Sequence, residues 1–463
     1  MKLIARFLTF LLASSVLFSC HSHYRSAAYS YVKPNQLSDE LPVDAMYNNG
    51  MDTGKIVALT KLILDNTYPN VHSMLILRHG KLIYENYFAG EDEIVGKGRA
   101  GYVDHTIDDL HDCRSVSKSF TSACIGIAIK QGFIKSIDEP IFSYFPEYAK
   151  YFDEGKRKIT MRHLLTMTSG LQWDENTPYL DPKNSEIQMD VSDDPVQFIL
   201  SRKLTSVPGT TWNYSAASAT LLGEILRKAT GERLDQFARK NLFAPLGIKK
   251  YIWEPMLKDK DMTAAAWGLR LRSRDLAKFG LLYMNDGKWG NKQVLDSDWV
   301  KQSLKAQVLR PSESPKTVLG YGFQFWTEPL TLPRYKTDLP FAMGRGGQLI
   351  IFWRSMDMVL VFTGGNYNRN YTGSDIYIAF THYIVPSVKE MQPYLTNGCF
   401  FRYIIIKVST KRSQLVRKIH PLIDIERRRS EIYQHKSLVQ YILGNGSKRP
   451  VIITREILKA SAG

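Results

Sequence analysis

The sequence predicts an α+β fold in which strands from both ends of the 463-residue chain form one antiparallel sheet. The first observation is a pair of β-type segments, 73–77 and 82–88, around a turn at 78–81. The second is a similar pair far downstream, 349–353 and 358–362. The third is that the intervening chain has mostly helical patterns. Together they predict a sheet of distant parts flanked by helices, with an inserted helical region and a site in the cleft between the two.

The individual elements follow from local signals. Gly80 lies in the tight part of the first turn, which favours a hairpin. Residues 321–326 are expected to form a further strand, and a final helix is expected over 374–385, ending before Pro386. Ser273 suits the N-cap of the last helix of the insert. The expected helices of the insert cover residues 120–131, 161–166, 217–230 and 273–284.

Composition indicates a globular protein and argues against a nucleic-acid partner. Hydrophobic residues make up 44% and charged residues 23% of the chain, and 4 cysteines are too few for a disulfide scaffold. The formal charge is +16, but residues 391–463 alone carry 14 basic against 4 acidic residues. Without this tail and the leader, residues 20–390 carry only +4. Most of the net positive charge therefore lies outside the main domain, whose surface is only mildly basic.

The N-terminus has the pattern of an export signal over residues 1–19. Lys2 and Arg6 precede an uncharged apolar run, 7–18, which is shorter than the roughly 20 residues needed to span a bilayer. The run ends at Leu-Phe-Ser-Cys, which resembles a bacterial lipoprotein processing site, with Cys20 as the lipidated residue. The alternative is an ordinary secretory signal that contains a cysteine. We expect an exported, lipid-anchored protein on the periplasmic or outer face of a bacterial membrane.

The chain is predicted to have four parts. After the leader, residues 20–54 are expected to be a tether, and residues 55–390 the folded domain. Residues 391–463 form a basic tail that we interpret as foreign to the fold, because it has no sustained helical or strand period. A tail that meets anionic lipid or polymer is the alternative.

The strongest chemical signal is Ser115 followed by Lys118 in Cys-Arg-Ser-Val-Ser-Lys-Ser-Phe, residues 113–120. If a helix begins here, the two side chains share one face, and Ser115 lies in the first turn, where free N–H groups favour a developing alkoxide. A serine nucleophile needs a neighbouring base, and Lys118 can be one only if burial or nearby cations keep it partly neutral. The apolar residues that follow predict a helix crossing the core, with Cys113 and Cys124 too far apart for a disulfide.

The Ser-x-x-Lys pattern is weak alone and occurs twice. Ser30 and Lys33 repeat it just before a proline, in the expected tether, without an apolar helix behind them. We interpret that copy as chance.

Two further segments offer groups that can complete a site. Tyr214 lies at the turn in residues 208–216 before an expected helix, where its phenol can relay protons; near a lysine ammonium its phenolate would be favoured. A tyrosine that only packs its ring is the alternative. Residues 344–348 read Gly-Arg-Gly-Gly-Gln before a strand, so Gly346 and Gly347 allow a close approach to substrate. Arg345 can bind a carboxylate, and a main-chain N–H here can pair with that of Ser115 as an oxyanion hole.

In this order the segments resemble the serine β-lactamase and penicillin-binding protein superfamily, in its class C-like branch of related hydrolases and esterases. The resemblance covers roughly residues 55–388. The segments that carry it are 114–119, 144–147, 159–160, 163–170, 208–209, 214–215, 268–269, 275–280 and 346–348.

The resemblance implies Ser115 as the acylated nucleophile, with Lys118 and Tyr214 sharing acid–base work. It implies that the N–H groups of Ser115 and Gln348 hold the oxyanion. Two departures argue against efficient β-lactam hydrolysis: Ala216 replaces an asparagine, and residues 345–347 lack the hydroxyl of the family's Lys-Thr-Gly motif.

We therefore expect a membrane-anchored serine hydrolase that cleaves an ester or amide through an acyl-enzyme. A cell-wall D,D-peptidase or β-lactamase, with a cell-wall peptide as substrate, is the first alternative, and a catalytically silent binding or sensing lipoprotein is the second. No cofactor is expected, and no zinc-ligand spacing is visible. Substrate specificity is expected to lie in loops such as 172–194.

Overall fold

A computed structural model describes residues 28–310, 319–332, 334–367 and 374–394. They belong to one compact unit that ends at Tyr394. The leader, Cys20 and most of the basic tail lie outside the described residues. Among the described residues, none of the helices has the length and apolar character that crossing a membrane requires.

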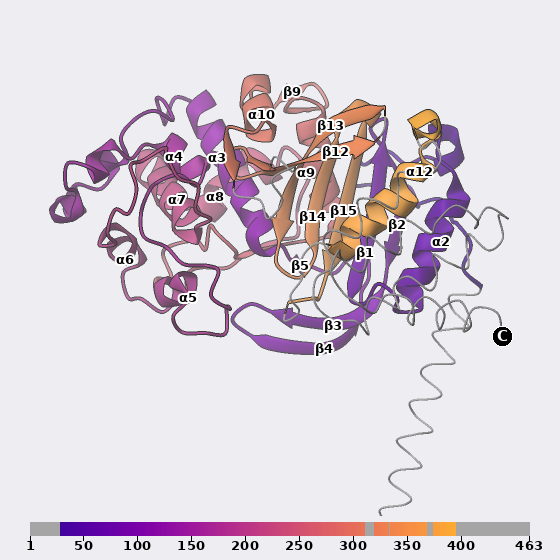
Figure 1. Ribbon diagram of the computed structural model, residues 1–463, viewed down its shortest axis with the longest axis horizontal. Coiled ribbons are helices and arrows are strands. Elements are labelled where there is room, and N and C mark those ends of the chain that lie inside the picture. The colour runs from indigo at the N-terminus through magenta and orange to yellow at the C-terminus, as the bar shows by residue number, and fades with distance from the viewer. Residues whose placement is uncertain (1–27, 311–318, 333, 368–373, 395–463) are drawn as a thin grey trace, which may run out of the picture. The chain divides into compact units, whose positions relative to one another are not determined.

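The central element is an eight-stranded sheet in the order β10-β11-β12-β13-β14-β15-β1-β2, with antiparallel neighbours throughout (Figure 1). The strand bounds are β1 Val71–Arg78, β2 Lys81–Tyr87, β10 Val308–Arg310, β11 Leu319–Tyr321, β12 Trp326–Leu332, β13 Tyr335–Gly344, β14 Gln348–Trp353 and β15 Met358–Gly364. Strands β1 and β15 pair along their length, with Met74 opposite Phe362. This pairing joins the two ends of the domain and confirms the predicted α+β class.

Smaller sheets surround the main one. They consist of β3 Ala89–Ile94 with β4 Gly98–Asp104, of β5 His111–Asp112 with β6 Ile252–Trp253 and β7 Leu269–Leu271, and of β8 Lys288–Trp289 with β9 Lys292–Gln293. The sequence patterns did not predict these strands, because most are only two or three residues long.

Both predicted hairpins are confirmed, but the strand expected over 321–326 is wrong. Residues between β11 and β12 form a turn, closed by a 2.7 Å hydrogen bond from the Gly322 N–H to the Phe325 carbonyl. Gln324 adopts φ +65°, outside the strand region. A Cβ on Gly322 would lie 2.0 Å from the carbonyl oxygen of Ser303, so this glycine lets the turn approach another main chain.

The sheet is covered on both faces. Helix α9 (Ser273–Met284) packs against β14 and β15, where Gly280 lies against Val359. Because side chains alternate along a strand, Phe362 points to the opposite face. There it meets α2 (Thr53–Leu64) and the C-terminal helical segment, which comprises α11 Ser374–Ala379, a π-helical turn Phe380–Ile384 and α12 Val385–Ser387.

Two predicted helix ends differ from the structure. Arg272, not Ser273, is the N-cap of α9, and Ser273 is the first helical residue. The C-terminal helical segment does not stop before Pro386, which lies in the first turn of α12, where a missing N–H costs nothing.

The helical region lies to one side of the sheet (Figure 1). Its centre is α3 (Ser117–Lys130), whose residues are all buried from Ser117 to Ala128, which confirms a helix that crosses the core. Cys113 and Cys124 are free and buried, as predicted. The other helices are α4 Met161–Leu165, α5 Ser185–Asp190, α6 Pro195–Leu200, α7 Ala216–Thr230, α8 Leu234–Ala238 and α10 Ser297–Leu304.

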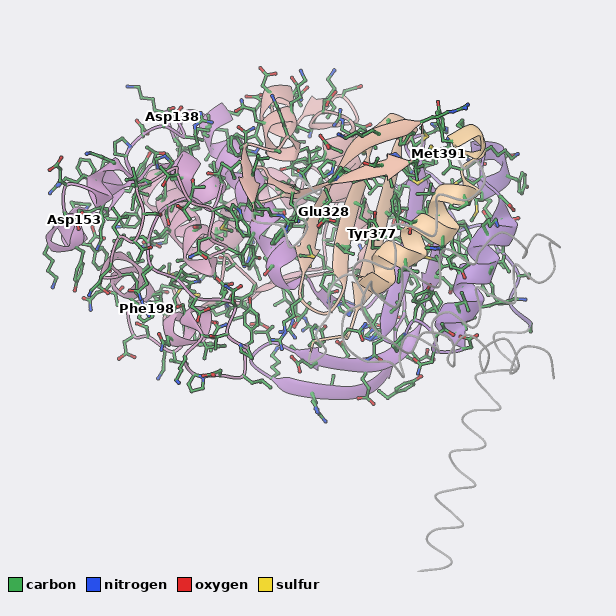
Figure 2. All side chains as sticks on the ribbon, in the orientation of Figure 1. Asp138, Asp153, Phe198, Glu328, Tyr377 and Met391 are labelled. Carbon is green, nitrogen blue, oxygen red and sulfur yellow. The ribbon has the colours of Figure 1, made fainter. Side chains whose placement is uncertain are left out.

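The folded domain extends beyond both predicted boundaries. In the segment expected to be a tether, Leu41 and Met46 are fully buried, and the Tyr31 hydroxyl donates to the Ile83 carbonyl at 2.9 Å. At the other end, Met391 (labelled in Figure 2) is fully buried, in a 3₁₀ segment Lys389–Tyr394. Apolar burial therefore makes residues 31–54 and 391–394 part of the domain.

Candidate active site

Ser115 lies in a 3₁₀ turn, Arg114–Val116, that leads directly into α3. Cys113, the residue just before this turn, is anchored by a 2.9 Å hydrogen bond from its N–H to the Leu269 carbonyl on β7. Arg114 has φ +49°, a left-handed conformation that is uncommon for a residue with a side chain. The turn is thus fixed from both sides and presents Ser115 at the helix N-terminus.

Lys118 lies one helical turn after Ser115 and is buried. Its Nζ donates hydrogen bonds of 3.0 Å to Ser115 Oγ and of 3.0 Å to the main-chain carbonyl of Ala266. The carbonyl holds the amine beside the hydroxyl. The structure therefore brings together the proposed nucleophile and the proposed base.

Tyr214 completes the group from the turn before α7. Its ring centroid lies 5.2 Å from Lys118 Nζ, and the ring stacks on Trp326 of β12 at 5.2 Å. Burial and the nearby Glu175 raise the pKa of Tyr214 well above its usual value, and a hydrogen bond with Ser115 offsets this only in part. The phenolate expected beside a lysine ammonium is therefore disfavoured here, because burial is the largest influence on the pKa of Tyr214.

The glycine-rich corner between β13 and β14 lies beside the turn Arg114–Val116, which we call the nucleophile turn after the proposed role of Ser115. A Cβ on Gly344 would lie 2.4 Å from the Cys113 carbonyl oxygen and 3.1 Å from Arg114 Cβ. Gly346 and Gly347 adopt φ +96° and +107°, which favour glycine. Gln348, the first residue of β14, is fully buried, and its side-chain amide bonds the Gly364 carbonyl at 2.6 Å. The chain carrying the predicted oxyanion-hole residue is therefore locked next to Ser115.

Arg345 lies on the same corner. Its Nε donates to the Tyr367 carbonyl at 2.7 Å, and its guanidinium carbon lies 4.8 Å from the centroid of the Tyr179 ring. Burial and the neighbouring Arg114 lower its pKa. Arg345 thus supplies positive charge between the corner and the loop 172–194.

Three carboxyl groups near Lys118 were missed by the sequence analysis: Glu175, Glu186 and Asp190. All come from the loop 172–194, and the last two lie on α5. Burial and the charge of Glu186 raise the pKa of Glu175 to about 8, and burial raises that of Asp190 to about 7. The pKa of Glu186 is also raised by burial, although Lys118 lowers it in part.

Glu175 is the best-connected member of this group. It accepts hydrogen bonds from Trp173 Nε1 at 2.5 Å, from the Tyr179 hydroxyl at 3.1 Å and from the N–H of Ala216. A carboxyl group thus contacts the position where the resemblance expected an asparagine. Sequence spacing alone gave no signal for Glu175; the i,i+4 spacing of Glu186 and Asp190 was the only hint.

The sequence is similar to those of known proteins. The model of a protein family described as Beta-lactamase matches residues 70–380. A Beta-lactamase of Escherichia coli strain K12 is 29% identical over 248 residues, 53% of this chain and 58% of that protein. A 6-aminohexanoate-dimer hydrolase of Paenarthrobacter ureafaciens is 24% identical over 252 residues, 50% of this chain and 56% of the relative. The chain thus spans little more than half the length of these curated relatives.

The fold is also similar to solved structures. EstCE1, described as a hydrolase with promiscuous acyltransferase activity, superposes with a TM-score of 0.57 at 17% identity, over 73% of this chain and 98% of that one. This likeness shows the fold. With the family match over most of the described domain, it leads to one conclusion. The chain belongs to the β-lactamase family of serine hydrolases.

Proposed function

We propose that this protein hydrolyses an ester or amide through an acyl-enzyme on Ser115. The observation that carries the proposal is the 3.0 Å hydrogen bond between Lys118 Nζ and Ser115 Oγ, in a site where Tyr214 faces the same lysine. A serine next to a buried amine is a nucleophile next to its base.

Acylation begins with proton transfer from Ser115 Oγ to Lys118 Nζ. A neutral amine has two N–H groups and one lone pair, so it can keep its bond to the Ala266 carbonyl while the lone pair accepts the serine proton. The oxygen of Ser115 then forms a bond to the substrate carbonyl carbon. The negative charge moves to the carbonyl oxygen, which we assign to the N–H groups of Ser115 and Gln348.

Tyr214 acts on the leaving group. Because its pKa is raised, it remains a phenol and can give its proton to the departing alkoxide or amine as the carbon–leaving-group bond breaks. The protonated Lys118 then returns its proton to the Tyr214 oxygen, so the product carries the Tyr214 proton and the serine proton ends on Tyr214. Deacylation by water runs the same transfers in reverse and regenerates the Ser115 hydroxyl.

The aromatic side chains around Tyr214 favour a substrate whose acyl group is uncharged. Rings of Trp212, Tyr214, Tyr321 and Trp326 contact one another with centroids 5.2–6.3 Å apart and form an aromatic wall. Trp212, Tyr214 and Trp326 retain partial exposure. Apolar and aromatic surfaces hold acyl chains without a requirement for charge. The Glu175 carboxyl accepts a hydrogen bond from the Ala216 N–H, which disfavours binding of a β-lactam amide at that position.

The test is hydrolysis of p-nitrophenyl esters of two to six carbons by the wild type and Ser115→Ala. The proposal requires loss of turnover in Ser115→Ala at unchanged unfolding temperature. The matched control is Ser30→Ala, in the second Ser-x-x-Lys, whose side chain is exposed; it should hydrolyse like the wild type. Turnover that survives in Ser115→Ala would refute the mechanism.

The same preparation separates the alternatives. Stable labelling of Ser115 by a fluorescent penicillin, without ester turnover, would identify a penicillin-binding D,D-peptidase, and hydrolysis of the penicillin would identify a β-lactamase. Failure of both esters and penicillin to acylate the protein would identify a silent binding protein.

We also propose that Cys20 is lipidated and that the protein is held at an exported membrane face. The support is the leader pattern alone. Metabolic labelling with an alkyne fatty acid tests it: incorporation in the wild type and none in Cys20→Ala is expected, and equal incorporation would contradict it.

A further inference from the structure

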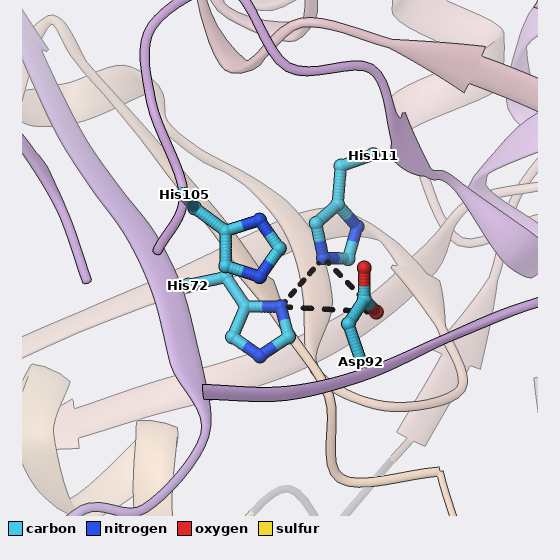
Figure 3. A group of neighbouring side chains, drawn as sticks. All are labelled: His72, Asp92, His105 and His111. Carbon is cyan, nitrogen blue, oxygen red and sulfur yellow. Dashed lines mark hydrogen bonds and ion pairs between the residues drawn. The ribbon is translucent and has the colours of Figure 1, made fainter. Parts of the chain in front are cut away.

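Three histidines and one aspartate meet outside the catalytic group: His72, Asp92, His105 and His111 (Figure 3). His72 is on β1, Asp92 on β3, His105 directly follows β4, and His111 is on β5. One ligand-type atom from each lies within 4.8 Å of the other three. All three imidazoles are buried, and the side chain of Asp92 is 13% exposed. The cluster is therefore a closed polar centre inside the domain.

The nitrogen and oxygen atoms are spaced as ligands of a small cation are. His72 Nδ1 lies 2.8 Å from His111 Nε2, and Asp92 Oδ1 lies 4.0 Å and 3.9 Å from these two atoms. Ligands around tetrahedral Zn²⁺, each at about 2.0 Å, are roughly 3.3 Å apart. The observed separations, 2.8–4.0 Å for these three atoms and up to 4.8 Å across all four residues, bracket this value, so shifts of about 1 Å would form the site.

His105 gives the independent sign of a missing partner. Its ring stacks on His72 with centroids 4.0 Å apart, and its Nε2 faces the other imidazoles (Figure 3). This atom is buried and has no hydrogen-bond partner among the described residues. A buried unpaired ring nitrogen is costly, and coordination to a cation would satisfy it.

Outer partners orient two members of the cluster, His111 and Asp92, as they do around metal ligands. His111 Nδ1 lies 3.2 Å from the Asp112 carbonyl oxygen, which fixes the tautomer that leaves Nε2 as a ligand. The Tyr367 hydroxyl donates to Asp92 Oδ1 at 3.0 Å. A histidine with its second nitrogen on a carbonyl, and a hydrogen-bonded carboxylate, are typical of such sites.

A plain hydrogen-bond network explains the cluster less well. One proton shared by His72 Nδ1 and His111 Nε2 satisfies that pair only. His105 Nε2 stays unpaired in such a network, and Asp92 Oδ1 lies 3.9 Å and 4.0 Å from the nitrogens of that pair, beyond hydrogen-bond reach.

We propose that His72, His105, His111 and Asp92 bind one divalent transition-metal ion, with Zn²⁺ as the best fit. Three imidazole nitrogens and one carboxylate oxygen suit tetrahedral Zn²⁺, and four protein ligands leave no open position for a substrate. The site is therefore structural rather than catalytic.

The location suggests what the ion stabilises. His111 lies four residues before Ser115, and the adjacent Asp112 pairs with Arg270 at 2.9 Å and with Arg114 at 3.6 Å. Arg114 in turn lies over the ring of Tyr367, 4.2 Å from its centroid, and Tyr367 bonds Asp92. Coordination would tie β1 and the β3–β4 hairpin to the nucleophile turn.

The test uses the protein purified without a polyhistidine tag and stripped with a chelator. Bound metal is measured after dialysis against ZnCl₂, together with the unfolding temperature. The wild type should bind about one equivalent of Zn²⁺ and unfold at a higher temperature with it. Co²⁺ in place of Zn²⁺ should give the visible absorption of a tetrahedral site.

Two variants keep the shape of the cluster. His105→Phe keeps the stacked ring but removes Nε2, and Asp92→Asn keeps the bond to Tyr367 but removes the charge. Each should weaken Zn²⁺ binding at least about tenfold. His79→Ala, at a surface histidine paired with Asp357, is the control and should bind like the wild type.

Wild-type affinity in either cluster variant would overturn the proposal. If both variants fail to fold, the wild type alone tests the proposal. A wild type that shows neither a Zn²⁺-dependent rise in unfolding temperature nor a tetrahedral Co²⁺ spectrum would also overturn it.

Discussion

The amine of Lys118 is held between Ser115 Oγ and the Ala266 carbonyl oxygen, 3.0 Å from each. The second contact comes from the segment just before β7, and Leu269, the first residue of β7, anchors Cys113. The proposed nucleophile and its proposed base are therefore positioned by neighbouring residues of one segment, so distortion of one displaces the other.

Replacement of Lys118 should remove the base without removing the core helix. Lys118→Met is expected to lower kcat/KM for p-nitrophenyl acetate by about 10²–10⁴-fold, the range of acid–base contributions. Loss of the bond to Ala266 should cost about 1–3 kcal/mol of unfolding free energy. Lys33→Met is the matched control and should leave both quantities unchanged. A Lys118→Met enzyme with wild-type turnover would contradict the role of this amine.

Tyr214→Phe should affect substrates according to their leaving group. The ring and its stacking on Trp326 remain, but the proton for the leaving group is lost. We expect kcat for alkyl esters and anilides to fall about 10²-fold or more, and kcat for p-nitrophenyl esters, which leave without protonation, to fall much less. Equal losses for both classes would show that Tyr214 does not act on the leaving group.

Glu175 should make stability fall with rising pH. Its pKa is about 8 in the folded protein against 4.5 ordinarily, so between these values the folded state holds a proton that the unfolded chain has released. The folded state binds more protons, and stability therefore decreases over this range by at most about 1.4 kcal/mol per pH unit.

Glu175→Gln removes this titration while keeping the shape of the side chain. Urea unfolding at pH 5, 6.5 and 8 should show a shallower pH dependence than in the wild type. Some slope should remain, because the pKa of Asp190 is also raised, to about 7. Glu154→Gln, at an exposed site, is the control. An unchanged slope in Glu175→Gln would contradict the raised pKa.

Gly344→Ala should disturb the site through the main chain. The new Cβ would lie 2.4 Å from the Cys113 carbonyl oxygen, so β13 or the nucleophile turn must move. We expect a loss of about 1–3 kcal/mol in unfolding free energy and a larger proportional loss of kcat than of substrate affinity. Wild-type turnover in Gly344→Ala would show that this contact does not position Ser115.

Much of the fold was predictable because its strands and helices are long and regular. The β1–β2 and β14–β15 hairpins, and α3 with its apolar surround, have patterns that local sequence determines. The 322–325 turn was misread as a strand, since its aromatic residues suit a strand, whereas Gln324 adopts positive φ in the tertiary structure.

The candidate site was only partly predictable. Ser115, Lys118 and Tyr214 carry motif signals, and the structure places them together. Glu175 and the cluster around His72 carry none, because their partners meet only through the packing of separate loops and strands. Residues 31–54 looked like a tether because their few buried side chains, such as Leu41, are scattered among polar ones.

The most direct test of the central claim is intact-mass analysis of the wild type mixed rapidly with p-nitrophenyl butyrate and quenched in acid. We expect a mass increase equal to one butyryl group, located by peptide mapping to Ser115 and absent from Ser115→Ala. A butyryl group found on another residue would contradict the acyl-enzyme account. So would turnover without any acylated protein in both the wild type and Ser115→Ala.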